Sequence, residues 1–472
     1  MSEPAPAYLV LSDGTRFEGL RLGAHGLAVG EVVFNTSMTG YQEMLTDPSY
    51  AGQILVPTYP MIGNYGINGT DWESRMIQVR GLVVREHCDQ PSHPESALTV
   101  HEYLLRHGIP GIAGVDTRAI TRRLRTRGVM MGVITDDPDI EHALEAIRSR
   151  PHYGEEDVVA EVTSAGVRPW DGTEEHGDPR WPGAEVVAPV ASGPVQAAVP
   201  RTVAVPGTIQ RAVPHAVAPP VSESVAARKG SAAAAPGAEA GGRVLPTPRG
   251  RPSTGRPSRE RRPRIVVADY GVKFNILRLL AKRGCDVVVV PSTASSADIL
   301  ALHPDGVVLS PGPGDPEILD DAVQVVRELA GKLPIFGICL GHQVVGRAFG
   351  ARTFKLKFGH RGGNHSVKDL ATGRVYITAQ NHGYSVAADG LPSDLEITHI
   401  DLSDGTVEGL RHRKLPIMTI QYHSEASPGP TDNEYLFDRF VETVDRATAD
   451  ATKVDRAMAR GAPHGGGSGE RR

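Results

Sequence analysis

The sequence predicts an α/β protein that consists of an N-terminal α+β domain, a long disordered linker and a C-terminal domain with a mostly parallel sheet. Strand-like and helical segments are mixed in the first part of the chain, and short apolar strands alternate with helices in the last part. Between them lies a stretch dominated by Ala, Pro, Gly, Val and Arg. We therefore assign residues 1–165 and 263–450 to the two domains, residues 166–262 to the linker, and residues 451–472 to a flexible tail.

Composition sets limits on the function. The chain has 472 residues, enough for two or three domains, and its formal charge of -5 gives no general attraction to nucleic acid or to an anionic membrane. Its three cysteines, Cys88, Cys285 and Cys339, lie far apart and suit neither a disulfide framework nor a zinc site. The N-terminal residues lack the pattern of a secretion signal, and no apolar run approaches the length of a membrane span. We expect a cytoplasmic protein without a bound metal.

The N-terminal domain carries both strand and helix signals. The segments LVLSDG and FEGL favour strands, whereas ESALTVHEYLLRHG favours a helix that ends at Gly108. This mixture predicts a compact α+β domain.

The linker prediction depends on proline spacing, because closely spaced prolines allow neither a helix nor a central strand to persist. The linker ends in RGRPSTGRPSRERRPR, residues 249–264, which contains seven arginines and one glutamate. This run could bind an acidic surface or nucleic acid, but a solvated run of charge is the simpler interpretation. We assign it no specific function.

The C-terminal domain shows the pattern of βαβ units. The apolar segments IVVAD, CDVVVVP, DGVVLS and LPIFGI alternate with helical segments such as NILRLLAKRG and AVQVVRELAG. Such alternation is typical of a doubly wound parallel sheet, in which ligands bind at the carboxyl ends of the strands. The loops that follow these strands are therefore the places to look for chemistry.

The loop after LPIFGI contains a candidate nucleophile. Cys339 stands at the centre of Gly337-Ile338-Cys339-Leu340-Gly341, between a strand and the helical segment VVGRAFG. This G-x-C-x-G spacing follows the logic of a nucleophile elbow, in which flanking glycines permit a strained turn and the helix N-terminus favours the thiolate. Cys88 and Cys285 lack this context, and a buried core position is the simpler interpretation for both.

A cysteine nucleophile needs a base and a group that orients the base. If the chain stays extended after the strand Ile417 to Gln421, His423 and Glu425 project to one side, and the carboxylate can hold the imidazole tautomer. An isolated H-x-E is a weak signal, and it gains weight only together with the elbow. His382 is a poorer candidate for the base because no carboxylate stands two residues after it.

Two further loops follow strands of the same sheet. The loop Pro311-Gly312-Pro313-Gly314 could bring a backbone N–H to an oxyanion, although a plain turn is the simpler interpretation of this loop alone. The polar segment 380–384, QNHGY, could hydrogen-bond an amino acid.

These motifs resemble a known family. GICLGHQ, SPGPGDP, QNHGY and HSEASPGP together are similar to the class I glutamine amidotransferases, a flavodoxin-like domain, over about residues 265–447. GEVVFNTSMTGYQEMLTDPSYAGQILVPTYPMIGNYGIN and GIPGIAGVDTRAITRRLR resemble the N-terminal domain of carbamoyl-phosphate synthetase small subunits. Other class I amidotransferases, such as anthranilate synthase, lack that block. The sequence departs from many relatives at Ser424, where proline is frequent, and in its much longer linker.

The resemblance implies roles for individual residues. Cys339 would be the nucleophile, His423 the base and Glu425 its partner. Gly312 and Leu340 would supply the two backbone N–H groups of an oxyanion hole. L-Glutamine would be bound by Ser49, Gly312, Gly314, Leu340, Gln343, Asn381, Gly383 and Tyr384. Ser49 implies that the first domain packs against the amidotransferase cleft.

The resemblance also implies a reaction and a partner. The subunit would hydrolyse glutamine without a cofactor of its own and pass ammonia to a large subunit, in a heterodimer or a higher oligomer. The large subunit would use ATP, magnesium and bicarbonate to make carbamoyl phosphate for arginine and pyrimidine biosynthesis, since the sequence has no P-loop. Two alternatives are an amidotransferase subunit of another synthase and a catalytically inactive regulatory subunit.

Overall fold

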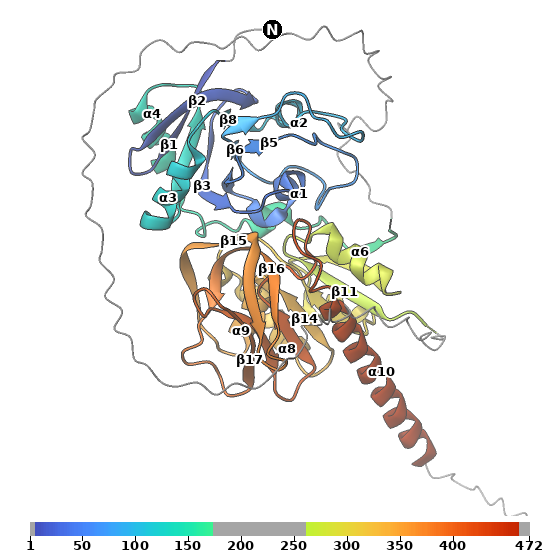
Figure 1. The fold of residues 1–472 in the computed structure, drawn as a ribbon. Coiled ribbons are helices and arrows are strands. Elements are labelled where there is room, and N and C mark those ends of the chain that lie inside the picture. Colours follow the sequence, from blue (N-terminus) through green and yellow to red (C-terminus); the bar gives the residue numbers. More distant parts are fainter. Residues whose placement is uncertain (1–4, 173–260, 462–472) are drawn as a thin grey trace, which may run out of the picture. The chain divides into compact units, whose positions relative to one another are not determined.

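A computed structural model describes residues 5–172 and 261–461, and these belong to one compact unit (Figure 1). Most of the predicted linker and the end of the predicted tail lie outside the described residues. Among the residues that are described, no helix is both long and apolar enough to cross a membrane.

The N-terminal domain is built around a closed barrel with the strand order β1-β2-β8-β6-β4-β3-β9. Its strands are β1 (Pro6–Leu11), β2 (Arg16–Gly23), β3 (Ala28–Asn35), β4 (Gln53–Pro57), β6 (Gly81–Val83), β8 (Pro110–Ala113) and β9 (Met130–Thr135), and β5 (Met61–Ile62) pairs with β7 (Glu86–His87) outside it. The helices are α1 (Tyr41–Thr46), η1 (Pro48–Tyr50), α2 (Val100–Arg106), α3 (Thr117–Arg127), α4 (Ile140–Arg148) and α5 (Val159–Val162). The predicted α+β mixture is confirmed.

The expected helix of this domain is α2. It begins with a capping box in which Thr99 accepts from the backbone of Glu102 and the Glu102 side chain accepts from the backbone of Thr99. It ends before Gly108, whose φ of 69° is the left-handed conformation that glycine adopts most easily.

The C-terminal domain contains a ten-stranded sheet with the order β10-β12-β11-β13-β14-β19-β18-β17-β15-β16. Its strands are β10 (Arg168–Trp170), β11 (Arg264–Asp269), β12 (Asp286–Pro291), β13 (Gly306–Leu309), β14 (Ile335–Ile338), β15 (Thr353–Asp369), β16 (Val375–Val386), β17 (Leu395–Asp401), β18 (Val407–His412) and β19 (Ile417–Ile420). The helices are α6 (Phe274–Lys282), α7 (Ser296–Ala301), η3 (Pro316–Ile318), α8 (Asp320–Leu329), α9 (Leu340–Ala348) and α10 (Tyr435–Gly461).

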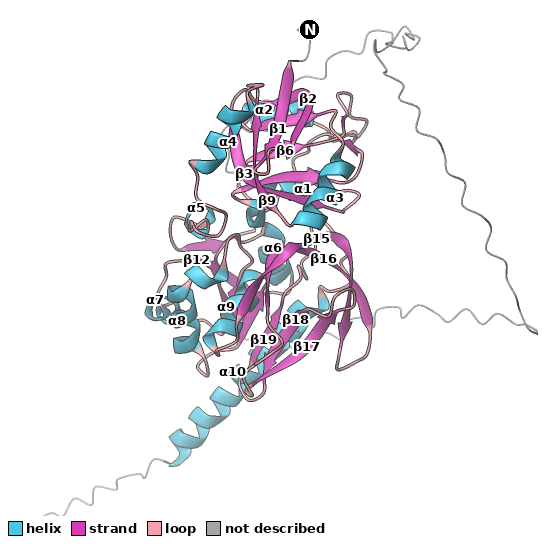
Figure 2. Cartoon of the chain, turned by 90° about the vertical axis from the view of Figure 1, so that its left-hand side faces the viewer, coloured by secondary structure: helices cyan, strands magenta, loops and turns pink. Residues whose placement is uncertain are grey.

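The helices cover both faces of the parallel part of this sheet (Figure 2). Val267 packs with residues of α6 and α10, whereas the next residue, Ala268, packs with residues of α7, α8 and α9. This alternation follows from the period of two in a strand, and it explains why both faces of β11 are apolar.

The predicted α/β class is confirmed, and the sheet is mixed. The strands β12, β11, β13, β14 and β19 are parallel to one another, but β10 and β15–β18 join through antiparallel pairings. The expectation of a mostly parallel sheet therefore holds for the central five strands. The strands β15 to β18 follow one another without an intervening helix, and such short connections favour antiparallel pairing.

Two expected boundaries differ from the structure. Residues 168–170, placed in the linker from sequence, form β10 and pair with β12. The final helix α10 continues to Gly461, past the domain end expected at residue 450. Its sequence contains no proline and no glycine before Gly461, so nothing in it interrupts the helix earlier.

Candidate active site

The turn between β14 and α9 has the geometry expected of a nucleophile elbow. Cys339 adopts φ 51° and ψ -104°, a conformation that is strained for any residue with a side chain. A Cβ atom on Gly337 would lie 2.6 Å from the Gly341 carbonyl oxygen, and one on Gly341 would lie 2.3 Å from the carbonyl oxygen of Leu309. Both glycines of the G-x-C-x-G pattern are therefore required by close backbone approach.

The Cys339 thiol is buried in polar surroundings at the N-terminus of α9. Its Sγ lies 3.7 Å from the backbone oxygen of Asn381 and accepts a hydrogen bond of 3.7 Å from Gln421 Nε2. The partial positive charge of a helix N-terminus favours a thiolate at this position.

His423 and Glu425 form a buried pair, with 2.6 Å between His423 Nδ1 and Glu425 Oε1. The backbone differs from the extended form expected from sequence. His423 pairs with Ala379 in an isolated bridge, and the chain turns at Ser424 and Glu425 before Ala426 N–H donates to the His423 carbonyl. The turn, rather than an extended i to i+2 arrangement, brings carboxylate and imidazole together.

Electrostatics favour charge on both members of this pair. Burial lowers the pKa of His423, but the Glu425 carboxylate and the Cys339 side chain outweigh burial and raise it to about 10. Burial raises the pKa of Glu425, but His423 and Lys273 bring it below its ordinary value. The imidazole is thus held as a cation next to the nucleophile.

Lys273 forms a buried ion pair with the Glu425 carboxylate. Its Nζ lies 3.3 Å from Glu425 Oε1 and donates to the Ala426 carbonyl, and the side chain is 2% exposed. Glu73 of the N-terminal domain is also buried nearby, and burial raises its pKa to about 8 although Lys273 and Arg278 oppose this shift. The triad is therefore part of a larger buried network of charges.

The two expected oxyanion donors lie on neighbouring loops that approach closely. Gly312 approaches so closely that a Cβ atom would lie 2.2 Å from the Tyr270 carbonyl oxygen and 2.8 Å from Leu340 Cδ2. Neither Gly312 N–H nor Leu340 N–H donates a hydrogen bond to any residue that the structure describes. Both donors are thus available to a ligand.

A cleft next to the thiol brings the predicted glutamine contacts together. It is lined by Ser49, Gln53, Tyr153, Gly312, Pro313, Gly314, Cys339, Gln343, Arg361, Asn381, His382, Gly383 and Tyr384. Of the eight residues expected to bind glutamine, only Leu340 does not line the cleft. Ser49 comes from the N-terminal domain, as expected, and its buried Oγ has no hydrogen-bond partner among the described residues.

The remaining polar contacts fix the walls of the cleft. Gln343 Nε2 donates to the Tyr384 carbonyl (2.8 Å) and to Gln421 Oε1 (3.0 Å). Asn381 Nδ2 donates to Asp47 Oδ2 of the N-terminal domain, at 2.9 Å. These bonds tie both domains to one site.

Comparison with known proteins agrees with this geometry. Residues 9–134 match the family "Carbamoyl-phosphate synthase small chain, CPSase domain", and residues 266–443 match "Glutamine amidotransferase class-I". The chain is 46% identical to the carbamoyl phosphate synthase small chain of Symbiobacterium thermophilum, over 93% of this chain and 98% of that protein. The corresponding proteins of Staphylococcus epidermidis and Listeria monocytogenes are 42% and 43% identical, over 92% of this chain and 94% and 95% of theirs.

The chain belongs to the carbamoyl phosphate synthase small chain family. Within this small chain, sequence reasoning missed several residues of the site. Tyr153, whose hydroxyl accepts from Gly314 N–H at 2.9 Å, follows α4 and carries no local motif. Arg361 and Lys273 stand in the segments KFGHRGG and DYGVKFN, in which no local motif indicates a role for either side chain. His382, the poorer candidate for the base, donates through Nδ1 to the Tyr384 carbonyl.

Proposed function

We propose that this small chain hydrolyses L-glutamine through Cys339, His423 and Glu425. The observation that supports the assignment best is the strained elbow at Cys339 beside the 2.6 Å His423–Glu425 pair. The same cleft contains seven of the eight residues expected to bind glutamine.

In the proposed reaction, the Cys339 thiolate attacks the carbon of the side-chain amide. The electron pair of the carbonyl moves to oxygen, and the N–H groups of Gly312 and Leu340 stabilise the oxyanion. The C–N bond then breaks as His423 gives a proton to the leaving ammonia. Water that His423 deprotonates attacks the glutamyl thioester, the C–S bond breaks, and glutamate is released while the proton held by His423 returns the Cys339 side chain to its starting state.

The raised pKa of His423 supports its part in these proton transfers. An imidazolium beside the sulfur stabilises the thiolate and has the proton that ammonia needs on leaving. Glu425 would fix the tautomer and orientation of the ring, as the acid of other triads does. Lys273 would act through Glu425 and is a positioning residue.

The ammonia would be used by the large subunit of carbamoyl phosphate synthase, in a heterodimer or a higher oligomer. That partner would consume ATP, with magnesium, and bicarbonate, whereas this chain would need no cofactor. We place the complex in the cytoplasm and its product in arginine and pyrimidine biosynthesis. The names of the relatives support the assignment to carbamoyl phosphate synthase. The substrates of the partner, the localisation and the pathways are what the family resemblance implies.

A paired assay tests the proposal. The wild-type chain and the Cys339→Ser variant are each combined with a large subunit, and glutamate and carbamoyl phosphate are measured with glutamine or ammonia as the nitrogen source. We expect the variant to lose glutamine-dependent synthesis by several powers of ten and to keep ammonia-dependent synthesis. Glutamine-dependent turnover in a pure variant would refute the assignment. Hydrolysis by the wild type without carbamoyl phosphate would favour another synthase, and no hydrolysis would favour an inactive regulatory subunit.

A further inference from the structure

Three strands of the C-terminal domain place two imidazoles and a carboxylate around one buried point. His360 lies on β15, His382 on β16 and Glu408 on β18, and the three side chains offer ligand atoms within 4.8 Å of one another. The distance from Glu408 Oε1 is 3.7 Å to His360 Nδ1 and 3.8 Å to His382 Nε2. The residues are 6%, 5% and 0% exposed, respectively.

All three converging atoms have no hydrogen-bond partner among the described residues. In each ring the other nitrogen lies within hydrogen-bond distance of a different partner. His382 Nδ1 lies 2.8 Å from the Tyr384 carbonyl oxygen, and His360 Nε2 lies 2.9 Å from Asp404 Oδ2. In its neutral form each ring would keep its proton on the outer nitrogen and turn a lone pair toward Glu408 Oε1. When both rings are neutral, three electron pairs meet in this buried place, and a cation between them, either a metal ion or a proton shared by His360 and Glu408, relieves their repulsion.

The surroundings have the features of a second coordination shell. A histidine that binds a metal usually donates its other N–H to a carboxylate or a carbonyl, as His360 does to Asp404 and His382 does to Tyr384. Gln380 Nε2 donates to Glu408 Oε2 at 2.8 Å, which leaves Oε1 directed at the histidines. Every ligand candidate is thus oriented by a separate partner.

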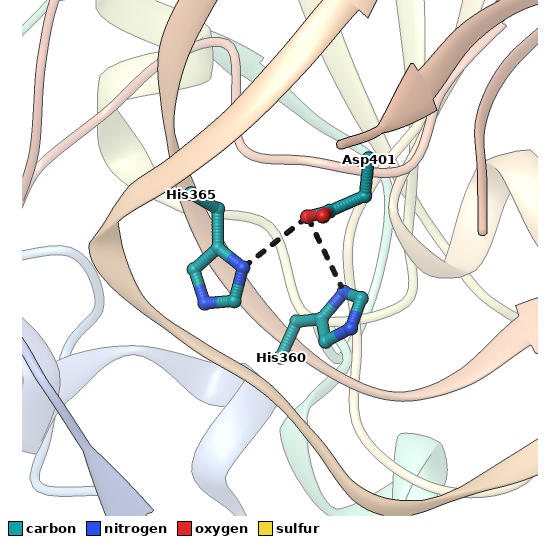
Figure 3. Close-up of side chains that lie close together, drawn as sticks. All are labelled: His360, His365 and Asp401. Carbon is teal, nitrogen blue, oxygen red and sulfur yellow. Dashed lines mark hydrogen bonds and ion pairs between the residues drawn. The ribbon is translucent and has the colours of Figure 1, made fainter. Parts of the chain in front are cut away.

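Figure 3 shows a neighbouring group that shares His360, in which the Asp401 carboxylate faces the rings of His360 and His365. Asp401 Oδ2 lies 4.0 Å from the same His360 Nδ1 and 3.3 Å from His365 Nδ1. A second carboxylate thus lies beside the His360 ring.

We propose that His360 Nδ1, His382 Nε2 and Glu408 Oε1 bind one zinc ion. Two imidazoles and one carboxylate form a familiar zinc ligand set, and ligand atoms about 2.0–2.1 Å from a tetrahedral ion lie roughly 3.3 Å apart. The observed separations of 3.7 and 3.8 Å need only a small contraction. The ion would tie β15, β16 and β18 together and brace the strand that carries Asn381, Gly383 and Tyr384. This role is structural, and it revises the expectation from sequence that the chain has no metal.

Metal uptake by the full-length chain, without an affinity tag, tests this site independently of glutamine hydrolysis. The chain would carry Cys339→Ser, so that the active-site thiol cannot compete, and would first be stripped with a chelator. Cobalt(II) is added while its visible absorption is followed, zinc is then used to displace it, and bound metal is counted by mass spectrometry. We expect one ion per chain and the bands of a four- or five-coordinate site.

Three further substitutions identify the ligands. Glu408→Gln should abolish stoichiometric uptake, and Asp404→Asn, a change at a half-exposed partner of His360, should weaken affinity about 10- to 100-fold. Glu73→Gln, which alters an equally buried carboxylate elsewhere, should keep full uptake. Absence of one-per-chain uptake by the parent would overturn the proposal, as would unchanged affinity in both Glu408→Gln and Asp404→Asn. Asp404→Asn keeps the test decisive if Glu408→Gln fails to fold.

Discussion

Replacing Lys273 by methionine tests the network behind the proposed triad. Lys273 and Glu425 are 2% and 0% exposed, with 3.3 Å between Nζ and Oε1, so the substitution leaves a buried carboxylate without its cation. Breaking a buried pair by removing one partner costs about 3–5 kcal/mol of unfolding free energy. The lost hydrogen bond to the Ala426 carbonyl, in the turn that carries Glu425, adds to this loss.

The assay for Lys273→Met combines urea unfolding with the pH profile of glutamine hydrolysis. Because Lys273 helps to hold the pKa of Glu425 low, the acidic limb of the profile should move to higher pH in the variant. Arg411→Met is the matched control, since Arg411 and Glu396 form an exposed pair that is worth at most about 1 kcal/mol. If Lys273→Met costs no more than Arg411→Met and leaves the acidic limb in place, Lys273 has no role in positioning Glu425.

Three more predictions concern the cleft and the triad. Gly312→Ala places a methyl group 2.2 Å from the Tyr270 carbonyl oxygen, so the loop must shift and kcat should fall about 10²–10³-fold. Gly69→Ala, where the added methyl group meets open space, is the control and should leave kcat unchanged; equal rates for the two variants would remove Gly312 from the oxyanion hole. The pKa of His423 is raised to about 10, so its contribution to stability should be complete below about pH 6.5 and be lost as the pH rises toward 10. Urea unfolding of the wild type and of His423→Asn across this pH range measures the contribution of His423. A difference in unfolding free energy that does not change with pH would contradict the prediction. A Cβ atom on Gly429 would lie 2.7 Å from the Cβ atom of Ala379, and Ala379 lines a second cavity together with His423 and Pro428. Gly429→Phe should therefore obstruct the exit of ammonia and raise the ratio of glutamate to carbamoyl phosphate. An unchanged ratio in a folded variant would make Gly429 a simple turn residue.

The sequence predicted those parts of the site that have a local pattern. The elbow at Cys339 was predictable because its two glycines are required within five residues of chain, and the His423–Glu425 pair because only one residue separates them. The backbone at Glu425 was not predicted, since a turn and an extended segment can both bring these side chains together.

Other features depend on segments far apart in the chain. Lys273 reaches Glu425 across 152 positions of sequence, and a single lysine carries no signal of such a contact. Tyr153 meets Gly314 in the same way. The antiparallel pairing of β15 to β18 was missed because the prediction relied on strands that alternate with helices, a pattern that this segment lacks. Their polar side chains include the proposed zinc ligands, which no spacing motif connects.

The central claim, that Cys339 is the nucleophile for glutamine, is tested most directly by an electrophilic glutamine analogue in which a chloromethyl ketone replaces the side-chain amide. Labelled sites are mapped by mass spectrometry while glutamine hydrolysis is followed. We predict one adduct per chain, on Cys339, formed in step with the loss of activity and slowed by glutamine. Inactivation with the label on Cys88 or Cys285, or with Cys339 unmodified, would contradict the account.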